Sequence, residues 1–358
     1  MATPPELRII VAPLDWGMGH ATRCIPLIKE LQSHGITVIV GGTEQSRQRI
    51  KAAGIISEYL DLPAYSIRYH KFLPAWLMVL LQFSKIIKAI KSEKKILNNY
   101  LKKNKVDALI SDNRYGVFNL KIPSVLITHQ IRPKSPFSIF QGITNKFVHN
   151  QLKNFNEIWI PDLTAEESIS GDLSIPFSGI TFKNIGILSR FEASKQLPHQ
   201  SNSVLAIVSG PEPQASIFQQ QLIRFAIRKK VRISIISSSE LPENNNLSED
   251  WIRLIHSPND QDFQRLVSEN KFIIMRSGYS GIMDMLRLGR TALLVPTPGQ
   301  TEQEYLAVRM KEFGFTAISQ KNLAELRLPD SFPSGLSAAH SDKGLLTDAV
   351  SGLVRTLQ

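Results

Sequence analysis

The sequence predicts an α/β fold built from two Rossmann-like domains. The chain has 358 residues, enough for two domains that each bury a core. A strand, a small-residue turn, a helix and a second strand begin at Arg8, and the same order of elements begins again at Val204. Two more strand–turn–helix units follow between Phe272 and Phe313. Strands and helices that alternate in this way form parallel sheets.

The opening of the N-terminal half is typical of a doubly wound sheet. An apolar strand over Arg8–Pro13 leads to a turn with Gly17 and Gly19, which allow a tight bend beside a bulky ligand. A helix follows over Cys24–His34, and a second strand over Thr37–Val40. Sheets of this kind bind ligands at the carboxyl ends of their strands.

His20 stands at the N-terminal end of that helix. The positive end of the helix dipole disfavours an imidazolium there, and this keeps the ring neutral and basic. His20 is therefore a candidate general base, or else a residue that only caps the helix. Asp15 is a second candidate base, or a carboxylate that orients His20.

Later strands of this half end in polar residues. Asp112 and Asn113 follow one strand, and His129 and Gln130 follow the next. Since parallel strands end at one edge of the sheet, we expect these side chains to lie together and to contact a substrate. A structural role for His129 at the sheet edge is the alternative. The elements expected here are a helix over Glu44–Ala53 and strands over Ile56–Leu60, Val106–Ser111, Ser124–Thr128 and Glu157–Pro161.

One segment of the N-terminal half suggests a membrane surface. The stretch Phe72–Phe83 is apolar almost all round and too short to cross a bilayer. Between Lys85 and Lys105 every charged residue except Glu93 is a lysine. An apolar segment beside lysines is typical of insertion into an anionic membrane surface. The alternatives are a buried core helix followed by a solvated basic helix, or a dimer contact.

Composition narrows the partners and the compartment. Lys and Arg number 42 against 31 Asp and Glu, a net charge of +11, which indicates an anionic partner. No RNP-type motif accompanies the lysines, so nucleic acid is not expected. The single cysteine, Cys24, excludes an internal disulfide and suits a reducing compartment. The sequence shows no signal peptide, no run of roughly 20 apolar residues and no Asp or His cluster at metal-ligand spacing, so we expect a cytoplasmic protein without a metal.

The second half contains three turns that suit anions. They hold Ser209 and Gly210, then Arg276–Gly281, then Thr297–Thr301. Each turn opens a helix, whose free backbone N–H groups and dipole favour a negative ligand. The expected strands are Val204–Ser209, Val231–Ile236, Trp251–His256, Phe272–Met275, Thr291–Pro296 and one from Thr316, with helices ending at Lys229, over Asn259–Asn270, before Gly289, over Glu302–Phe313 and over Leu345–Leu357.

The segment Arg276–Tyr305 resembles the nucleotide-sugar-binding region of the GT-B glycosyltransferases and, within them, the MurG-like group, glycosyltransferase family 28. The matching features are the RSG turn, the acidic Asp284 six positions past its glycine, and an ending with Val295, Pro296, Gln303 and Tyr305. The resemblance implies two Rossmann-like domains that face a central cleft. We expect residues 1–185 to form the acceptor- and membrane-facing domain, 186–202 the linker, 203–335 the nucleotide-sugar domain, and 336–358 a segment whose helix packs back on the first domain.

The resemblance also implies roles for the turn residues. Asp284 would accept hydrogen bonds from the ribose hydroxyls, and backbone groups at Ile255 would hold the uracil ring. Arg276 would pair with the phosphates or brace the fold. The other implied contacts are Ser277, Gly278, Tyr279 and Ser280 with the phosphates, Gln303 and Glu304 with the sugar hydroxyls, and Ser209, Gly210, Gly299, Gln300 and Thr301 with the leaving diphosphate.

The acceptor side departs from the family pattern. Resembling enzymes carry a His-Glu-Gln-Asn signature, whereas this chain keeps Gln130 but has His129 in place of the glutamate. The departure indicates an acceptor other than the peptidoglycan precursor. The acceptor-binding residues expected by resemblance are Gly17, Gly19, Asp112, Asn113, His129 and Gln130.

The function implied by the resemblance is the transfer of a hexose or N-acetylhexosamine from a UDP-sugar, such as UDP-N-acetylglucosamine. The reaction would be an inverting, metal-independent displacement with no cofactor beyond the UDP-sugar substrate. The acceptor would be amphipathic or lipid-linked, and the enzyme peripheral on the inner face of the cell membrane. The alternatives are a non-hydrolysing UDP-sugar epimerase and a non-catalytic nucleotide-sugar-binding or scaffold subunit.

Overall fold

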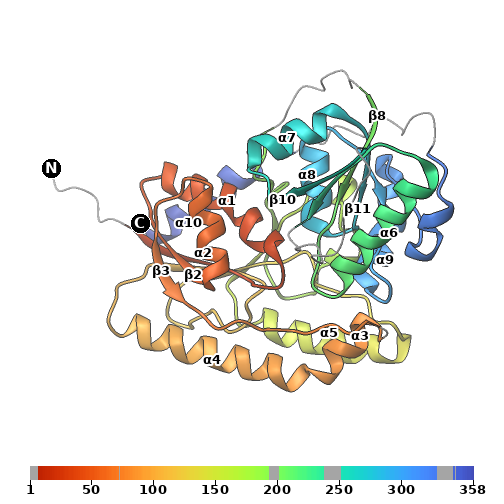
Figure 1. Ribbon diagram of the computed structural model, residues 1–358. Helices are drawn as coiled ribbons and strands as arrows, with labels where there is room; N and C mark the ends of the chain where they lie inside the picture. Colours follow the sequence, from red (N-terminus) through yellow and green to blue (C-terminus); the bar gives the residue numbers. More distant parts are fainter. Residues whose placement is uncertain (1–6, 72, 193–200, 238–250, 329–341, 343) are drawn as a thin grey trace. The chain divides into compact units, whose positions relative to one another are not determined.

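The structure is a computed structural model that describes residues 7–71, 73–192, 201–237, 251–328, 342 and 344–358. These residues form two compact units. The first contains residues 7–67, 79–190, 342 and 344–358, and the second contains the described residues of 68–78 and 191–328. Each unit is built on a parallel sheet (Figure 1), which confirms the predicted α/β class.

In the described part of the chain, the first unit holds a seven-stranded sheet with the order β3-β2-β1-β4-β5-β6-β7. The chain runs outward from β1 in one direction and then resumes on its other side with β4, so the switch point at which such sheets bind ligands lies between these two strands. Pro13 at the end of β1 is opposite Asp112 at the end of β4. The strands are β1 (Arg8–Pro13), β2 (Thr37–Gly42), β3 (Glu58–Asp61), β4 (Ala108–Asp112), β5 (Ser124–Ile127), β6 (Glu157–Ile160) and β7 (Phe182–Asn184).

Helices of the first unit pack on one another as well as on the sheet. α1 packs against both α2 and the last helix, α10. α4 and α5 lie side by side (Figure 1), with the rings of Phe83 and Phe147 5.3 Å apart in an edge-on contact. The helices are α1 (Met18–Ser33), α2 (Glu44–Ala52), α4 (Phe83–Leu101), α5 (Ser138–Leu152), α10 (Leu345–Leu357) and the 3-10 turns η1 (Ala165–Glu167) and η2 (Gly171–Ser174); α3 (Ala75–Leu81) begins in the second unit and ends in the first.

The second unit repeats this plan with a six-stranded sheet among its described residues, in the order β10-β9-β8-β11-β12-β13. Its switch point lies between β8 and β11. The strands are β8 (Ser201–Ile207), β9 (Ile233–Ser237), β10 (Ile252–His256), β11 (Asn270–Met275), β12 (Leu293–Leu294) and β13 (Thr316–Ala317); the helices are α6 (Gln214–Lys229), α7 (Asp260–Glu269), α8 (Tyr279–Arg287), α9 (Thr301–Arg309), η3 (Met310–Phe313) and η4 (Gln320–Glu325).

The central strands of both sheets are buried on both faces. In β1 the side chains of Ile9, Ile10 and Val11 are fully buried, as expected of a parallel sheet covered by helices. In the second unit Phe218 of α6 and Leu323 of η4 share one core cluster with the strands. Each such buried side chain stabilises the fold by about 1.5–3 kcal/mol.

Four element predictions needed correction. α1 begins at Met18 rather than Cys24, because Gly17 takes a positive φ of 93° that ends the preceding turn, and His20 therefore lies in the first helical turn. β7 lies near the end of the expected first domain, residues 1–185, where no strand was predicted after Glu157–Pro161; its three half-buried residues are too few to show a strand period. β12 is shorter than predicted, and the helix after it continues as the 3-10 turn η3.

Some expected features fall outside the described residues. They include Phe72, most of the linker after residue 192, and residues 329–341, which contain the start of the segment expected at 336–358. Of the stretch Phe72–Phe83, Ala75–Leu81 forms α3 and Phe83 begins α4. None of the helices described here is both long and apolar enough to span a bilayer.

Candidate active site

A histidine–aspartate pair lies at the switch point of the first sheet. His20 Nδ1 is 3.0 Å from Asp112 Oδ2. Asp112 ends β4 and is fully buried, whereas the His20 side chain is 16% exposed. The α1 turn that carries His20 and the end of β4 meet because β1 and β4 are neighbours with Pro13 opposite Asp112. A buried carboxylate thus fixes one imidazole nitrogen and leaves the other for a substrate.

Two further side chains of α1 complete the surroundings of Asp112. Arg23 Nε lies 2.8 Å from Asp112 Oδ2, and its guanidinium also binds Oδ1. Cys24 Sγ lies 3.6 Å from Oδ2. Residues three and four positions apart share one helix face, so His20, Arg23 and Cys24 all reach the same carboxylate. We did not predict Arg23 from the sequence; its spacing of three from His20 was the available signal.

Electrostatics keeps His20 neutral. Burial lowers the pKa of His20, Arg23 and His129 oppose protonation of the ring, and Asp112 only partly offsets them. Burial alone would raise the pKa of Asp112, but the charge of Arg23 and the hydrogen bonds from His20 and Arg23 outweigh it and hold the pKa below its ordinary value. An ionised Asp112 beside a neutral imidazole selects the tautomer in which Nδ1–H donates to the carboxylate, so Nε2 keeps a lone pair. A general base needs this state.

Asp15 has a different place from the one predicted. Its carboxylate accepts the backbone N–H of Tyr65 at 3.1 Å and lies 3.7 Å from the guanidinium of Arg114. The carboxylate that contacts and orients His20 is therefore Asp112, which the sequence analysis had placed among the acceptor contacts.

The remaining predicted residues of the first unit lie around this pair. Gly17 precedes α1 with no atom near the position of a side chain, and Gly19 is in its first turn. Asn113 adopts a left-handed φ of 57° directly after Asp112. His129 is buried and close enough for its charge to act on His20. The backbone N–H of Gln130 donates to Thr128 Oγ1 at 3.0 Å.

In the second unit, the turn before α8 is the best anion site. No side chain caps α8 at Gly278, and its first turn holds no acidic residue. The Ser277 hydroxyl is buried and donates to the backbone oxygen of Gln303 at 2.8 Å, so it braces the turn. Tyr279 is buried and Ser280 is half-buried. The backbone N–H groups of α8 are thus the donors that this turn can offer to a phosphate.

The turn before α9, unlike the turn before α8, carries negative charge. Glu302 and Glu304 lie in the first turn of α9, and Glu304 Oε1 accepts the N–H of Gly299 at 2.9 Å. The amide oxygen of Gln303 accepts the N–H of Thr297 at 2.8 Å. Gln300 precedes the helix and Thr301 begins it. Carboxylates here repel a phosphate but accept hydrogen bonds from hydroxyls.

The turn after β8 offers few donors. Pro211 and Pro213 have no N–H, and the carboxylate of Glu212 accepts the N–H of Ser216 at 3.3 Å. Ser209 and Gly210 are exposed, with Gly210 at a φ of 105°. This turn is therefore a weaker phosphate site than the start of α8.

Arg276 is built into the fold. It is 1% exposed and donates to the backbone oxygens of Val295, Pro296 and Gln214 and to Gln320 Oε1. Burial lowers its pKa to about 9. These contacts brace the turns, which is one of the two roles expected for Arg276. Of the other predicted residues, Ile255 is in β10 and Asp284 is half-buried on α8.

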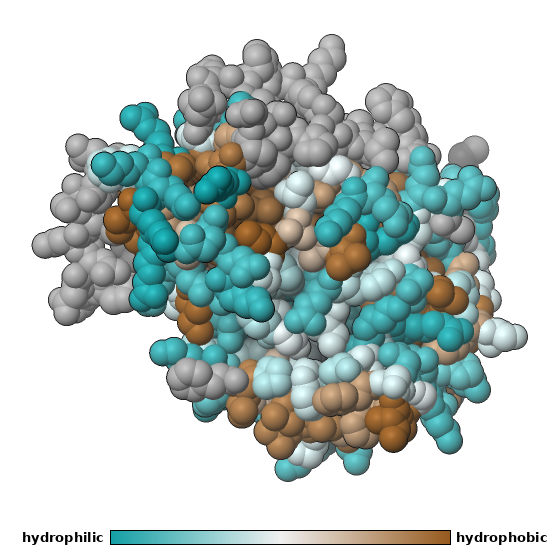
Figure 2. Space-filling model, turned by 90° about the vertical axis from the view of Figure 1, so that its right-hand side faces the viewer, coloured by the Kyte–Doolittle hydropathy of each residue, from teal (hydrophilic) through white to brown (hydrophobic). Residues whose placement is uncertain are grey.

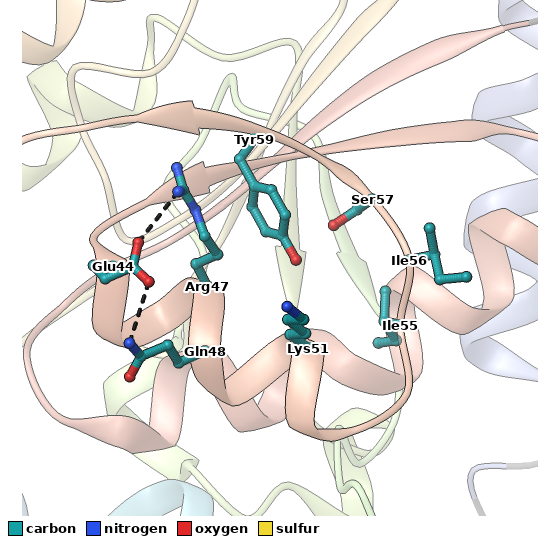
Figure 3. Close-up of a pocket in the computed structure, with 8 residues that line it drawn as sticks. All are labelled: Glu44, Arg47, Gln48, Lys51, Ile55, Ile56, Ser57 and Tyr59. Atoms are coloured by element: carbon teal, nitrogen blue, oxygen red, sulfur yellow. Dashed lines mark hydrogen bonds and ion pairs between the residues drawn. The ribbon is translucent and has the colours of Figure 1, made fainter.

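A hollow of about 550 Å³ lies elsewhere, between α2 and β3. Figure 3 shows Arg47, Lys51 and Tyr59 along it, with the Arg47 guanidinium 4.6 Å from the centre of the Tyr59 ring. None of the predicted site residues lines this hollow. Across the described ranges, no group of three or more His, Cys, Asp or Glu side chains is placed to hold a metal ion.

Relatives found by sequence are named glycosyltransferases. No family model matches the chain. It is 22% identical over 343 residues to an uncharacterized glycosyltransferase of Methanosarcina mazei, covering 86% of this chain and 84% of that protein. A second uncharacterized glycosyltransferase, from Methanosarcina acetivorans, is 22% identical over 329 residues with the same coverage.

Solved structures with this fold cover almost the whole chain. Arabidopsis thaliana UGT89C1 has a TM-score of 0.66 at 14% identity, over 97% of this chain and 99% of that one. The glycotransferase of kitacinnamycin has a TM-score of 0.64 at 14% identity, over 99% and 95%. Acinetobacter baumannii MurG has a TM-score of 0.58 at 15% identity, over 98% and 100%. The chain therefore has the GT-B fold, and its likeness to named glycosyltransferases, MurG among them, confirms the predicted resemblance to the GT-B, MurG-like glycosyltransferases.

Proposed function

We propose that the chain transfers a hexose or N-acetylhexosamine from a UDP-sugar to a hydroxyl group of an amphipathic or lipid-linked acceptor. The observation that carries this proposal is the His20–Asp112 pair at the switch point of the first sheet, in which the buried carboxylate lies 3.0 Å from His20 Nδ1. The glycosyltransferase names of the relatives support the reaction class.

The proposed step is a single displacement. His20 Nε2 takes the proton of the acceptor hydroxyl while its oxygen attacks the anomeric carbon. The bond from that carbon to the diphosphate oxygen breaks, and UDP leaves with the electron pair. Attack opposite the leaving group inverts the anomeric centre. The imidazolium that forms is stabilised by the Asp112 carboxylate 3.0 Å from Nδ1.

The second unit would hold the two parts of the donor at two different helices, the charged diphosphate at α8 and the uncharged sugar at α9. The first turn of α8 has no acid and no side-chain cap, which suits the diphosphate. The first turn of α9 carries Glu302 and Glu304, which suits the uncharged sugar hydroxyls. Asp284, on α8, would accept hydrogen bonds from the ribose, as the motif resemblance implies.

The acceptor class rests on an exposed apolar surface of the first unit. Leu80, Leu81 and Phe83 are 42–64% exposed beside α5. Figure 2 shows apolar side chains gathered in a brown band at the bottom of the view, where these helices lie. Lys85, Lys88, Lys91 and Lys95 are exposed along α4. Apolar side chains beside lysines favour an anionic lipid surface, on the inner membrane face in this proposal. The exposed apolar residues of the neighbouring segment are Phe137, Ile139, Phe140 and Ile143.

The test begins with ligand binding. The melting temperature is measured with millimolar UDP, GDP or TDP; a ligand at about 100 times its Kd adds about 2.7 kcal/mol of stability. UDP-sugars are then incubated with octyl or dodecyl glycosides, and UDP and glycosylated products are quantified. UDP formed only with an acceptor supports transfer. An epimerised UDP-sugar without acceptor indicates the epimerase, and binding without turnover indicates the scaffold.

A further inference from the structure

Directly behind the His20–Asp112 pair lies a buried ionic network that the proposed reaction does not use. Its centre is Arg114, two residues after Asp112, whose side chain is fully buried. Its Nη1 lies 2.6 Å from Oε1 of Glu93, a residue of α4. Glu93 is also fully buried, and it accepts the Tyr65 hydroxyl at 3.0 Å and the Gly116 N–H at 3.1 Å.

The side chain of Arg114 fastens the segment that leads to His20. Its Nε donates to the backbone oxygen of Pro13 at 2.7 Å, and its Nη2 lies 3.7 Å from Asp15 Oδ1. Pro13 ends β1, and only a short turn separates it from the start of α1. The guanidinium thus fixes one end of the turn that carries His20.

The backbone of Arg114 fixes the turn that carries Asp112, the partner of His20. The Arg114 N–H donates to Ser111 Oγ at 3.0 Å, and the Ser111 hydroxyl donates to the Arg114 oxygen at 2.6 Å. These bonds close a tight turn in which Asn113 takes a left-handed φ of 57°. Since Asp112 lies inside this turn, the direction of its carboxylate depends on the place of Arg114.

α4 holds this turn from the far side. A side chain at Gly116 would lie 2.3 Å from the Ile90 oxygen and 2.7 Å from the Glu93 side chain. Real carbon atoms do not approach so closely, so α4 packs directly on the Asn113–Gly116 turn. Glu93 is the one acid in a run of lysines, and a buried carboxylate in such a helix is costly unless it has an ionic partner.

We propose that Arg114 is a positioning residue for the His20–Asp112 pair and that Glu93 acts through it. The inference rests on the proposed function only for its effect on turnover. Its structural content is that Arg114 sets the distance between His20 Nδ1 and the Asp112 carboxylate, and this can be measured without substrate.

The experiment is a double-mutant cycle with two readouts, using Glu93→Gln, Arg114→Met and the double variant. Misplacement of a catalytic group by about 1 Å can cost ~10²-fold in rate, so Arg114→Met is expected to lower kcat by about that factor with KM for the UDP-sugar unchanged. Glu93→Gln keeps the shape and is expected to have a smaller effect. The double variant is expected to equal Arg114→Met, because the inference has Glu93 act through Arg114. A further loss in the double variant would assign part of the effect to the contacts of Glu93 with Tyr65 and Gly116.

The second readout is the pKa of His20, followed by NMR of 13C-labelled histidine and assigned with His20→Gln. Asp112 raises this pKa, whereas Arg23 and His129 lower it. Loosening Asp112 should therefore lower the pKa of His20 in Arg114→Met. Arg290→Met is the matched control, because Arg290 is also buried and bound to backbone oxygens, but in the second unit.

The outcomes separate the two proposals. A lowered His20 pKa in Arg114→Met, with none in Arg290→Met, supports the positioning role even if no transfer is found. An unchanged His20 pKa in a folded Arg114→Met overturns it, whatever the activity. If Arg114→Met does not fold, Glu93→Gln decides alone: an unchanged pKa and unchanged kcat overturn the inference. A wild-type chain without turnover counts against the proposed function only.

Discussion

At the residue scale, the proposed reaction depends on one imidazole nitrogen. Replacing His20 with Gln keeps a polar side chain but removes the base. General-base catalysis contributes about 10²–10⁴-fold, so kcat should fall by that factor while the Kd for UDP stays unchanged. The measurement is steady-state kinetics together with calorimetric UDP binding. A His20→Gln enzyme with wild-type kcat would remove His20 from the mechanism.

The pH dependence of turnover follows from the same residue. The pKa of His20 is lowered, so the base stays unprotonated as the pH falls through about 6.5, the ordinary value for histidine. The acid limb of the kcat/KM profile, which reports the pKa of the free enzyme, should therefore lie below that pH. Rate profiles between pH 4.5 and 8 check this. A limb at or above the ordinary value would contradict the direction of the shift.

Arg23 tests how much the buried pair stabilises the fold. Its guanidinium is 2% exposed and binds a fully buried carboxylate, so Arg23→Met removes the cation beside Asp112 and leaves only the contacts from His20 and Cys24. Breaking a buried pair costs about 3–5 kcal/mol, measured by urea unfolding. Arg228→Gln is the control, because its pair with Glu325 is exposed and worth about 0–1 kcal/mol. Equal losses in the two variants would refute the distinction.

The place of His20 at the start of a helix could be predicted from the sequence, because a glycine turn followed by a helix is a local pattern. The residue that contacts His20 could not be predicted in this way. Asp112 is 92 residues away, and its contact depends on β4 pairing beside β1 in register with Pro13. Asp15, close in sequence, was the plausible alternative, but Tyr65 and Arg114 hold its carboxylate elsewhere.

At the scale of elements, helix N-termini distinguish the proposed phosphate and sugar sites. Ser280 lies in the first turn of α8, which has no acid. An aspartate there should stabilise the helix by about 0.3–1 kcal/mol, yet it would repel a diphosphate. Ser280→Asp is thus expected to raise the melting temperature slightly and to weaken UDP binding by about tenfold, or ~1.4 kcal/mol. Uridine, which carries no phosphate, is the control ligand, and an equal loss for both ligands would contradict the assignment.

The turn before α9 offers a test of backbone geometry. Gly299 has a φ of 75°, and a side chain there would lie 2.6 Å from Pro74 Cβ. Gly299→Ala should therefore combine backbone strain with overlap and cost more than the ~1–3 kcal/mol of strain alone. Gly210→Ala is matched, because Gly210 also has a positive φ but nothing near the new side chain. Unfolding free energies give the comparison, and a smaller loss for Gly299→Ala would count against the packing.

Element bounds were predictable where burial is periodic and failed where it is not. The last helix, Leu345–Leu357, was predicted to the residue because its apolar residues recur with the helical period. β7 was missed because three half-buried residues beside β6 show no period. The turns before α8 and α9 were expected from the small residues that precede each helix, but the engagement of Gln303 and Glu304 with backbone N–H groups was not, since those bonds depend on the folded turn.

At the scale of the whole molecule, the net charge of +11 points to a membrane role only because of where some of the lysines lie. Lys88 and Lys91 are exposed on α4, in the unit that also exposes Phe140 and Ile143. Lysines near an anionic lipid surface contribute about 1 kcal/mol each. Lys88→Glu with Lys91→Glu is expected to weaken binding to vesicles of phosphatidylglycerol and phosphatidylcholine by at least about tenfold in co-sedimentation.

The control for this prediction is Lys311→Glu with Lys321→Glu, which changes the net charge equally at exposed positions of the second unit. Equal losses in the two double variants would mean that overall charge, and not the α4 surface, attracts the vesicles. The contribution of the apolar side chains to membrane binding can be tested separately, because Phe140→Ser with Ile143→Ser removes two apolar side chains and no charge. Binding that persists at high salt in the wild type should be lost in that variant, since salt screens the lysines but leaves apolar insertion. Wild-type binding that salt abolishes completely would leave the exposed apolar side chains without a role at the membrane.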